Sequence, residues 1–354
     1  MINYAAALWA QRPGKVLVSD VEHSSNLLPW LRTGEIVQFQ TNNRGKIEHD
    51  LGNLLQHESV KLVSFTGCSN LTGYKPCLQW YAGKAHVARA RLFVDACQLV
   101  PHNKLTMDVR AENREFNIDF AAFSGHKMYA PYGTGVLVGP KKFFDESEPY
   151  QIGGGNIPYI TSQLKVKRFQ NARTHDPGTP NFIGALAIAK SSELLERIGY
   201  DQIEKYETSL TKYAHELLSK IDYFIHYSSP TSSESGHTLI PFDMYPFDGR
   251  LVAEILAEEH GIGVRAGSFC DYELVRKLKN VSLDEDACIA AEVDRGITKN
   301  IPCVVRASIG LQNRLEDIDR LYDALATIHE SRSDYYLERY EQNPVSGRWS
   351  LRGN

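Results

Sequence analysis

FSGHKMY, at Phe123–Tyr129, lies between two apolar runs around which the rest of the chain is organised. The run before it, Ile118–Phe123, predicts a buried strand, and the run after it, Gly133–Gly139, predicts a glycine turn into another strand. Burying a lysine as a cation is costly, so Lys127 needs either solvent or a chemical role. The ordinary interpretation is a loop lysine in water. The chemical one is a Schiff base, in which a desolvated amine condenses with an aldehyde such as pyridoxal phosphate (PLP).

A carboxylate at the end of another predicted strand favours the chemical interpretation. Leu92-Phe93-Val94 are followed by Asp95, a pattern typical of the carboxyl end of a parallel strand, where the sites of α/β proteins gather. PLP needs an acidic partner, because its ring withdraws electrons best when the ring nitrogen is protonated. We therefore expect Asp95 to lie beside the ring nitrogen of a cofactor bound at Lys127.

Three short strings occur in an order that resembles one enzyme family. They are VDACQ at Val94–Gln98, SGHK at Ser124–Lys127 and RAGSFC at Arg265–Cys270. This order resembles the class V aminotransferase family of fold type I PLP enzymes, and most of all its cysteine desulfurase and selenocysteine lyase branch. The resemblance extends from Ile2 to Ile328. It implies an α/β fold, a fold type I PLP-dependent transferase, with a mainly parallel sheet flanked by helices and a smaller C-terminal α+β domain.

The resemblance also implies contacts to the cofactor ring. His23, in EHSSN at Glu22–Asn26, matches a histidine that stacks on the pyridine and transfers protons; a structural histidine at a strand end is the alternative. Asn70, in SNLTG at Ser69–Gly73, matches an asparagine that bonds the phenolic oxygen; a turn asparagine is the alternative. Gln98 is expected to contact the cofactor from the turn after Asp95.

Phosphate contacts follow in the same way. Ser124 and His126 are expected to hold the cofactor phosphate. Thr179, in DPGTPN at Asp176–Asn181, resembles a threonine that reaches the phosphate of the neighbouring subunit, which implies a homodimer with shared sites. The alternative is a turn leading into a helix. GGGN at Gly153–Asn156 resembles the family's glycine-rich segment near the active site.

Two residues of the C-terminal half are candidates for substrate chemistry. In desulfurases, a loop with the spacing of Arg265–Cys270 carries the cysteine that takes sulfur as a persulfide, so Cys270 is the expected nucleophile. A free, non-catalytic cysteine is the alternative. Arg265 could depress the pKa of this thiol. Arg306 ends the predicted strand Pro302–Ser308, and its guanidinium fork suits the carboxylate of a substrate.

Composition excludes several other classes of protein. The chain has 354 residues, 42% hydrophobic and 23% charged, with a formal net charge of −4, which predicts no nucleic-acid or membrane partner. The six cysteines form no CxxC pair, so no metal site is predicted. Scattered thiols, and the lack of an apolar run of roughly 18 residues, predict a cytoplasmic protein.

The beginning of the sequence differs from the family pattern. In the family, a glycine-threonine-threonine loop that holds the cofactor phosphate comes immediately before the helix that matches Ile2–Ala5. The resemblance therefore implies an upstream segment that this sequence lacks. A fragment, a misassigned start and a naturally shortened form all stay open as explanations.

The expected domain organisation has three parts. Residues 1–185 are expected to form a large, N-terminally truncated PLP-binding domain, and 186–330 a small α+β domain with the loop cysteine. Residues 331–354 form a polar tail, either a docking arm or partly disordered. The acidic insert Val281–Lys299 lies near the predicted mouth of the site, where it could change substrate size or the sulfur acceptor.

The sequence is compatible with three functions. The leading hypothesis is a PLP-dependent desulfurase that removes sulfur from L-cysteine through a Lys127 Schiff base and a Cys270 persulfide, with a protein as a candidate sulfur acceptor. The second is a class V aminotransferase or another amino-acid lyase that does not use the thiol. The third is a truncated, non-catalytic paralogue that acts as a binding subunit.

Overall fold

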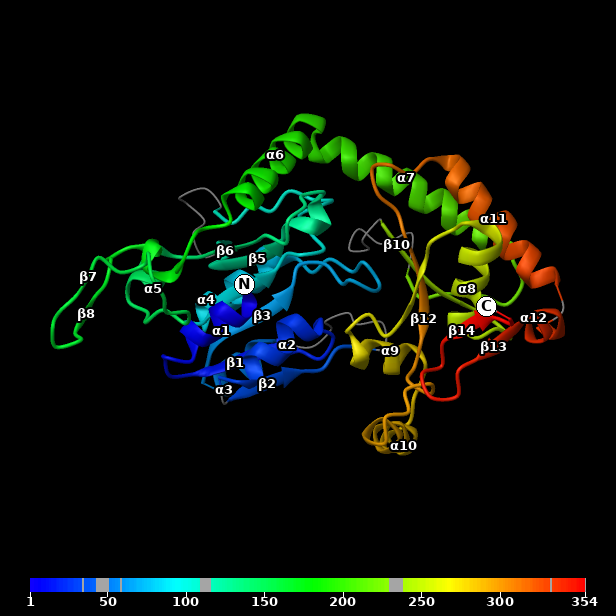
Figure 1. Cartoon of the computed structure of the whole chain (residues 1–354), viewed down its shortest axis with the longest axis horizontal. Helices are drawn as coiled ribbons and strands as arrows, with labels where there is room; N and C mark the ends of the chain where they lie inside the picture. The colour runs from blue at the N-terminus through cyan, green and yellow to red at the C-terminus, as the bar shows by residue number, and fades with distance from the viewer. Residues whose placement is uncertain are drawn as a thin grey trace. The chain divides into compact units, whose positions relative to one another are not determined.

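The computed structural model describes residues 1–33, 35–42, 51–57, 59–108, 116–228, 238–331 and 333–353. The chain divides into two compact units. Unit 1 comprises Met1–Gln40, Glu48–Cys68 and Pro76–Asp201, and unit 2 comprises Thr41–Ile47, Ser69–Lys75 and Gln202–Asn354. In Figure 1, unit 1 runs from blue to green, and unit 2 carries most of the yellow and red elements.

Unit 1 is built on a six-stranded sheet with the order β2-β1-β3-β4-β5-β6. Neighbouring strands are parallel except for β6, which is antiparallel to β5. The runs of apolar residues that predicted buried strands become its centre, because a parallel sheet is covered on both faces. This confirms the expected mainly parallel sheet. The strands are β1 (Lys15–Ser19), β2 (Ile36–Phe39), β3 (Val60–Thr66), β4 (Arg91–Asp95), β5 (Phe120–Ser124) and β6 (Gly135–Val138).

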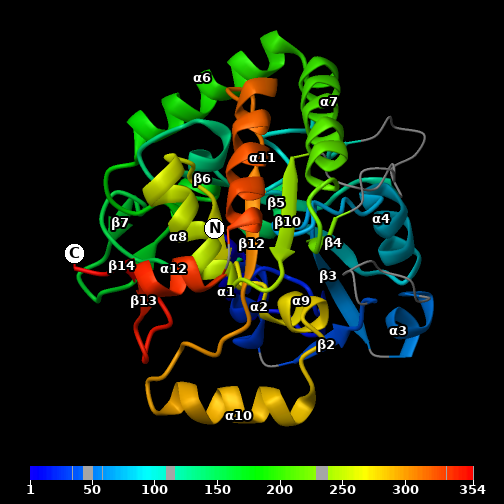
Figure 2. The ribbon, with the colours of Figure 1, turned by 90° about the vertical axis from the view of Figure 1, so that its right-hand side faces the viewer.

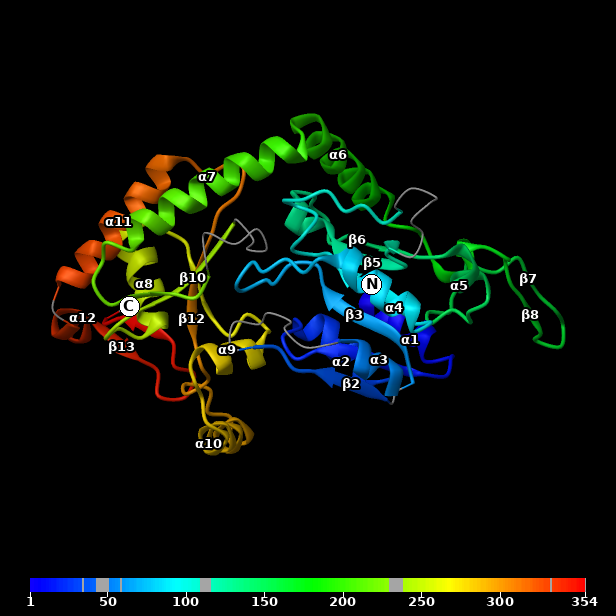
Figure 3. The same ribbon diagram turned by 180° about the vertical axis from the view of Figure 1, so that it is seen from behind.

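Helices cover both faces of this sheet. On one face, α1 (Ile2–Trp9), α2 (Ser24–Leu31) and α5 (Lys141–Asp145) pack in a core that includes Trp30 and Phe93, whose rings meet edge to face at 5.2 Å. Figure 1 shows α1 and α2 on the near face. α3 (Leu51–His57) and α4 (Leu78–Val87) pack on strands from the other face, which Figure 3 shows from behind. The sheet is therefore a buried, rigid platform for its strand ends.

The remaining elements of unit 1 follow the sheet. A hairpin of β7 (Tyr159–Ile160) and β8 (Val166–Lys167) precedes α6 (Phe182–Ile198). Gly199, with a φ of +90°, ends α6, and α7 (Tyr200–Leu218) begins after it.

Unit 2 has a four-stranded antiparallel sheet with the order β11-β12-β10-β9. α7, α8 (Gly249–His260) and α11 (Leu315–Glu330) contribute to its core. Asp248 is the N-cap of α8, and the helix ends at Gly261, which has a left-handed φ of +63°. Its strands are β9 (Phe224–His226), β10 (Leu239–Met244), β11 (Arg265–Gly267) and β12 (Val304–Ser308).

The polar tail is folded in the structure, so the alternative of a partly disordered segment is wrong, whereas the docking arm stays a prediction. It forms α12 (Ser333–Arg339) and a hairpin of β13 (Tyr340–Gln342) with β14 (Trp349–Leu351). Tyr336 and Tyr340 are buried in the core of unit 2, and the Tyr340 hydroxyl donates to Glu259 at 2.9 Å. Two buried aromatic rings outweigh the polar composition that suggested disorder.

The acidic insert forms a helix of its own. α10 (Leu283–Asp294) follows α9 (Tyr272–Leu278) and begins with a capping box between Ser282 and Glu285. It has no buried residue, and Figure 2 shows it standing apart from the other helices of unit 2. Among the described residues, no helix is long and apolar enough to cross a membrane.

Candidate active site

The carboxyl ends of four parallel strands bring the predicted cofactor residues of unit 1 to one edge of the sheet. Asp95 ends β4 and stands in register with Thr66 at the end of β3. On its other side Asp95 is in register with Ala122 of β5, two residues before Ser124. His23 follows β1, the neighbour of β3. Strand ends on one edge converge regardless of their separation along the chain, which is why this half of the site follows from the sequence pattern.

Asp95 is a buried carboxylate with a fixed orientation. Its side chain is 5% exposed, and its Oδ1 accepts the backbone N–H of Cys97 at 3.0 Å. Burial and the nearby Asp95 charge raise the pKa of the Cys97 thiol to about 12, while Lys127 acts in the opposite direction. Cys97 is therefore a protonated neighbour of Asp95 and Lys127 and is not a nucleophile at neutral pH.

Lys127 lies in the short 3-10 helix η2 (Gly125–Met128) directly after β5. The residue after η2, Tyr129, has a left-handed φ of +63° and ends the turn. Gly125 is required at the start of η2, because a Cβ there would approach the Ile188 side chain to 2.8 Å. This close packing holds Lys127, which is half-buried, at the strand end, whereas His126 of the same turn is exposed.

Ser124 has a buried hydroxyl. It lacks a hydrogen bond of good geometry within the described part of the chain, although it faces the Cys97 thiol. A buried donor without a good partner is costly in a folded protein, and such a group commonly serves a ligand. Gln98 is half-buried in the turn after β4.

Together these groups fit the chemistry of PLP. A buried carboxylate suits the ring nitrogen, a half-buried lysine amine suits the aldehyde, and a hydroxyl without a good partner suits a phosphate oxygen. The residues that match are Asp95, Lys127 and Ser124.

His23 is the N-cap of α2, and its imidazole is oriented by the helix. The ring Nδ1 accepts the backbone N–H of Ser25 at 3.0 Å. In the neutral ring this bond places the proton on Nε2.

A buried network under His23 was missed by the sequence interpretation. Glu22 is 3% exposed and accepts three hydrogen bonds: Ser19 Oγ at 2.6 Å, Asn26 Nδ2 at 2.7 Å and the Thr66 N–H at 3.1 Å. Burial nevertheless raises its pKa to about 8. The network joins the end of β1 to α2 and β3, and so fixes the backbone that carries His23. A carboxylate inside a strand-end turn was the signal that could have revealed it.

Thr179 lies in an exposed turn of unit 1 that contacts the glycine-rich segment. The Gly178 N–H donates to the Gly154 carbonyl at 2.7 Å, so the strings at 153–156 and 176–181 pack together. Asn181 caps α6 by accepting the N–H of Gly184 at 3.0 Å.

In unit 2, Arg306 lies on β12 opposite Arg265 of β11. Burial, with a smaller contribution from Arg265, lowers the pKa of Arg306 to about 10. Its guanidinium donates to the backbone carbonyl of Asn70, while its buried Nε has no partner among the described residues. A half-buried guanidinium with a buried, unused donor is suited to bind a carboxylate.

The loop of Cys270 packs directly on this arginine. The Phe269 ring lies 4.6 Å from Arg306 Cζ and 5.7 Å from Arg265 Cζ. The Asn70 side chain donates from Nδ2 to the Phe269 carbonyl at 2.9 Å. Asn70, predicted to bond a cofactor oxygen, is thus connected to the loop of the candidate nucleophile. Phe269 was not identified from the sequence, although an aromatic residue directly before the cysteine was its signal.

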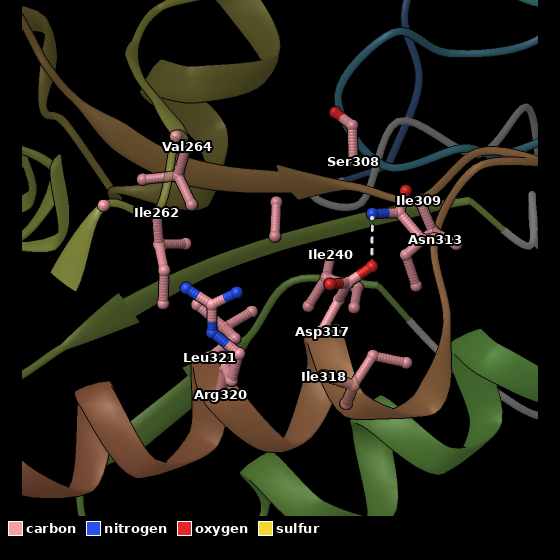
Figure 4. Close-up of a pocket in the computed structure, with 13 residues that line it drawn as sticks. Ile240, Ile262, Val264, Ser308, Ile309, Asn313, Asp317, Ile318, Arg320 and Leu321 are labelled. Atoms are coloured by element: carbon pink, nitrogen blue, oxygen red, sulfur yellow. Dashed lines mark hydrogen bonds between the residues drawn. The ribbon is translucent and has the colours of Figure 1, made fainter.

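A pocket of unit 2 lies on the other face of the same sheet. Its volume is about 260 Å³, and Figure 4 shows Asp317 and Arg320 of α11 at its rim. Ala307 and Ile240, which are paired across β12 and β10, line it. Side chains alternate along a strand, so Arg306 points to the opposite face. This pocket is therefore distinct from the site of Arg306 and Cys270.

Comparisons with known proteins agree with this arrangement of residues. The class-V aminotransferase family model matches residues 1–321. A probable cysteine desulfurase of Staphylococcus aureus (strain Mu50) is 32% identical over 326 residues, covering 89% of this chain and 70% of that protein. A cysteine desulfurase of Haloferax volcanii is 27% identical over 336 residues, covering 93% and 72%.

Solved structures show the same fold. A cysteine desulfurase from Escherichia coli has a TM-score of 0.75 at 26% identity, covering 95% of this chain and 76% of that one. The apo structure of a cysteine desulfurase from Thermococcus onnurineus has a TM-score of 0.77 at 27% identity, covering 93% and 76%. The chain therefore belongs to the class-V aminotransferase family of PLP-dependent enzymes, within its cysteine desulfurase branch.

Proposed function

We propose that this chain is a cysteine desulfurase that holds PLP at Lys127 and transfers the sulfur of L-cysteine to Cys270. The observation that carries the proposal lies in unit 2. There Arg306, a half-buried cation suited to a carboxylate, packs on Phe269, the residue that precedes the thiol of Cys270. An anchor for an amino acid and a nucleophile for its side chain are thus neighbours.

The residues of unit 1 provide proton and charge control. Asp95, a buried carboxylate, stabilises positive charge on the ring nitrogen of the cofactor. Lys127 carries the cofactor and, once released by the substrate amine, moves protons at the substrate carbon. His23 stacks on the ring and donates from Nε2, because its Nδ1 is engaged by Ser25. When bound, PLP supplies a ring that withdraws electrons from the substrate.

Ser124 and His126 are assigned to the phosphate of PLP. Gln98 and Asn70 are assigned to its ring. Ser124 offers the buried hydroxyl, and His126 lies two residues along in η2. The residues assigned to the cofactor thus lie at strand ends and in the turns that follow them.

In the sulfur-transfer step, the Cys270 thiolate forms a bond to the sulfur of the substrate as the Cβ–S bond breaks. The electron pair of that bond stays on Cβ, which gains a proton, so alanine leaves and Cys270 becomes a persulfide. Arg306 holds the substrate carboxylate through two parallel hydrogen bonds during this step. An acceptor, such as another protein, then removes the sulfur.

We also propose a homodimer in which Thr179 faces the partner subunit. The β7–β8 hairpin of unit 1 exposes Tyr159, Ile160, Leu164 and Val166, with 82% of the Leu164 side chain accessible. Exposed apolar side chains in such a cluster favour burial against another protein surface. Sedimentation of wild type and Leu164→Asp tests this proposal: a dimer that dissociates more readily in the variant supports it, and an unchanged monomer contradicts it.

The function is tested by two measurements on purified protein. Incubation with PLP should give a visible absorption band in wild type that Lys127→Ala lacks. Incubation with L-cysteine and dithiothreitol, which reduces the persulfide, should then yield alanine and sulfide in wild type but not in Cys270→Ala. Sulfide release that persists unchanged in Cys270→Ala contradicts the persulfide step and favours a lyase or aminotransferase that does not use the thiol.

A further inference from the structure

The Cys270 loop has an unfavourable backbone conformation. Phe269 and Cys270 have consecutive positive φ angles of 55° and 58°, a region that residues with a side chain rarely adopt. Neither is a glycine, which would adopt this conformation without cost. Two such residues in sequence persist only where surrounding contacts hold them in place.

Those contacts meet at Phe269, which is 5% exposed. Its ring packs on the guanidinium of Arg306 at 4.6 Å, and its carbonyl accepts from Asn70 Nδ2 at 2.9 Å. Arg306 in turn donates to the backbone carbonyl of Asn70. Three residues from distant parts of the sequence of unit 2 therefore form a closed set of contacts around the residue before Cys270.

On the other side, the loop is anchored to a helix. Asp271 is 2% exposed, caps α9 by accepting the Leu274 N–H at 3.3 Å, and donates its own N–H to the Ser268 carbonyl at 2.9 Å. Because α9 fixes the C-terminal end of the loop, the mobility of the Cys270 side chain depends on the contacts of Phe269.

We propose that Phe269 is a positioning residue. It restrains the Cys270 loop while its ring packs on Arg306, and it releases the loop when Arg306 binds a carboxylate. A carboxylate bound by Arg306 neutralises the charge on which the Phe269 ring packs, and so weakens that contact and the bond from Arg306 to the Asn70 carbonyl. Loss of those contacts releases the left-handed conformation and lets the thiol move. This inference rests on the proposed function, in which Arg306 binds the substrate carboxylate.

The test is the alkylation rate of each cysteine by iodoacetamide, followed by mass spectrometry of its peptide in otherwise native protein. Cys288, exposed on α10, is the internal reference in every sample. Phe269→Leu removes the ring and should raise the rate at Cys270 about tenfold relative to Cys288, the scale of one lost cation–π contact. Phe269→Tyr keeps a ring and should restore a rate close to that of wild type.

A carboxylate probe tests the coupling itself. L-alanine should accelerate alkylation of Cys270 in wild type, and L-alaninamide, which lacks the carboxylate, should not. In Phe269→Leu, L-alanine should have little further effect. An equal Cys270 rate in wild type and Phe269→Leu, or an equal effect of L-alanine and L-alaninamide, overturns the proposal.

Kinetics separate this role from general destabilisation. Phe269→Leu should lower KM for L-cysteine, because the substrate carboxylate no longer displaces the ring from Arg306, whereas general destabilisation of the site would raise KM. Failure of the alkylation test with normal desulfuration rejects only the coupling. Alkylation that behaves as expected in a protein that does not desulfurate L-cysteine rejects the proposed function and leaves the coupling intact.

Discussion

The candidate site residues are held in two different ways in the two units. In unit 1, Asp95, Ser124 and His23 lie at the ends of parallel strands whose registers fix them, over a buried core. In unit 2, Arg306 lies on an antiparallel strand, but Cys270 belongs to a loop held by side-chain contacts and two left-handed residues. Strand ends give rigid placement suited to a cofactor, whereas a loop allows the movement that a sulfur carrier needs.

The first prediction tests the rigid half, at Lys127. Lys127→Ala should lower the rate of alanine formation from L-cysteine at least ~1,000-fold, because the variant lacks the amine that carries the cofactor and moves protons. Lys104→Ala is the matched control, since Lys104 is an exposed lysine of unit 1 paired with Glu196. If both variants form alanine at similarly reduced rates, the loss reflects the stability of unit 1 and not the catalytic role of Lys127.

The second prediction concerns the anchor of unit 2. Arg306→Lys should raise KM for L-cysteine by about 30- to 100-fold, because a lysine cannot form two parallel hydrogen bonds to a carboxylate. The comparison with cysteamine, which lacks the carboxylate, provides the control: its weak reaction should be equally slow in both proteins. An unchanged KM for L-cysteine contradicts the assignment of Arg306.

The third prediction uses the buried carboxyl of unit 1. The pKa of Glu22 is raised from its ordinary value of 4.5 to about 8, so the folded protein binds a proton that the unfolded chain has lost between these values. Its contribution to stability is therefore fully present below pH 4.5 and declines as pH rises to about 8. In wild type, the hydrogen-exchange protection of unit 1 peptides should therefore decline over this pH range. Glu22→Gln should remove the decline.

Above about pH 8, where Glu22 is ionised and accepts from all three donors, Glu22→Gln should also lower desulfuration by about tenfold, since an amide places a donor against Asn26 Nδ2 and disturbs the turn that carries His23. Glu22→Asp, which keeps the carboxyl group and shortens the side chain, is the companion variant. Protection that depends on pH equally in wild type and Glu22→Gln contradicts the role of this carboxyl.

The fourth prediction has the opposite sign and belongs to unit 2. The rings of His215 and His226 lie 4.5 Å apart with a tilt of 31°, and burial lowers the pKa of each to about 4. The unfolded chain therefore binds protons first as pH falls from 6.5 to about 4, and unit 2 loses stability in that range. His226→Phe should reduce this loss in the exchange of unit 2 peptides and leave unit 1 unaffected. Equal acid sensitivity in both proteins contradicts it.

The sequence predicted unit 1 more completely than unit 2, for physical reasons. Buried parallel strands appear as uninterrupted apolar runs, so the positions of Asp95 and Lys127 at strand ends followed from the pattern. The contact between Asn70 and Phe269 joins residues 199 positions apart through one side-chain hydrogen bond, which leaves no periodic signal. The fold of the tail was missed because Tyr336 and Tyr340 are buried within an otherwise polar segment. Glu22 was missed because a buried carboxylate is recognised only once its three donors are placed.

The most direct test of the central claim is the mass of the peptide that contains Cys270 after a single turnover with L-cysteine and PLP, without an acceptor thiol. The persulfide mechanism predicts one additional sulfur atom on Cys270, formed together with one alanine, and neither product in Lys127→Ala. Alanine formed in wild type without added sulfur on Cys270 would contradict the assignment of Cys270 as the sulfur carrier.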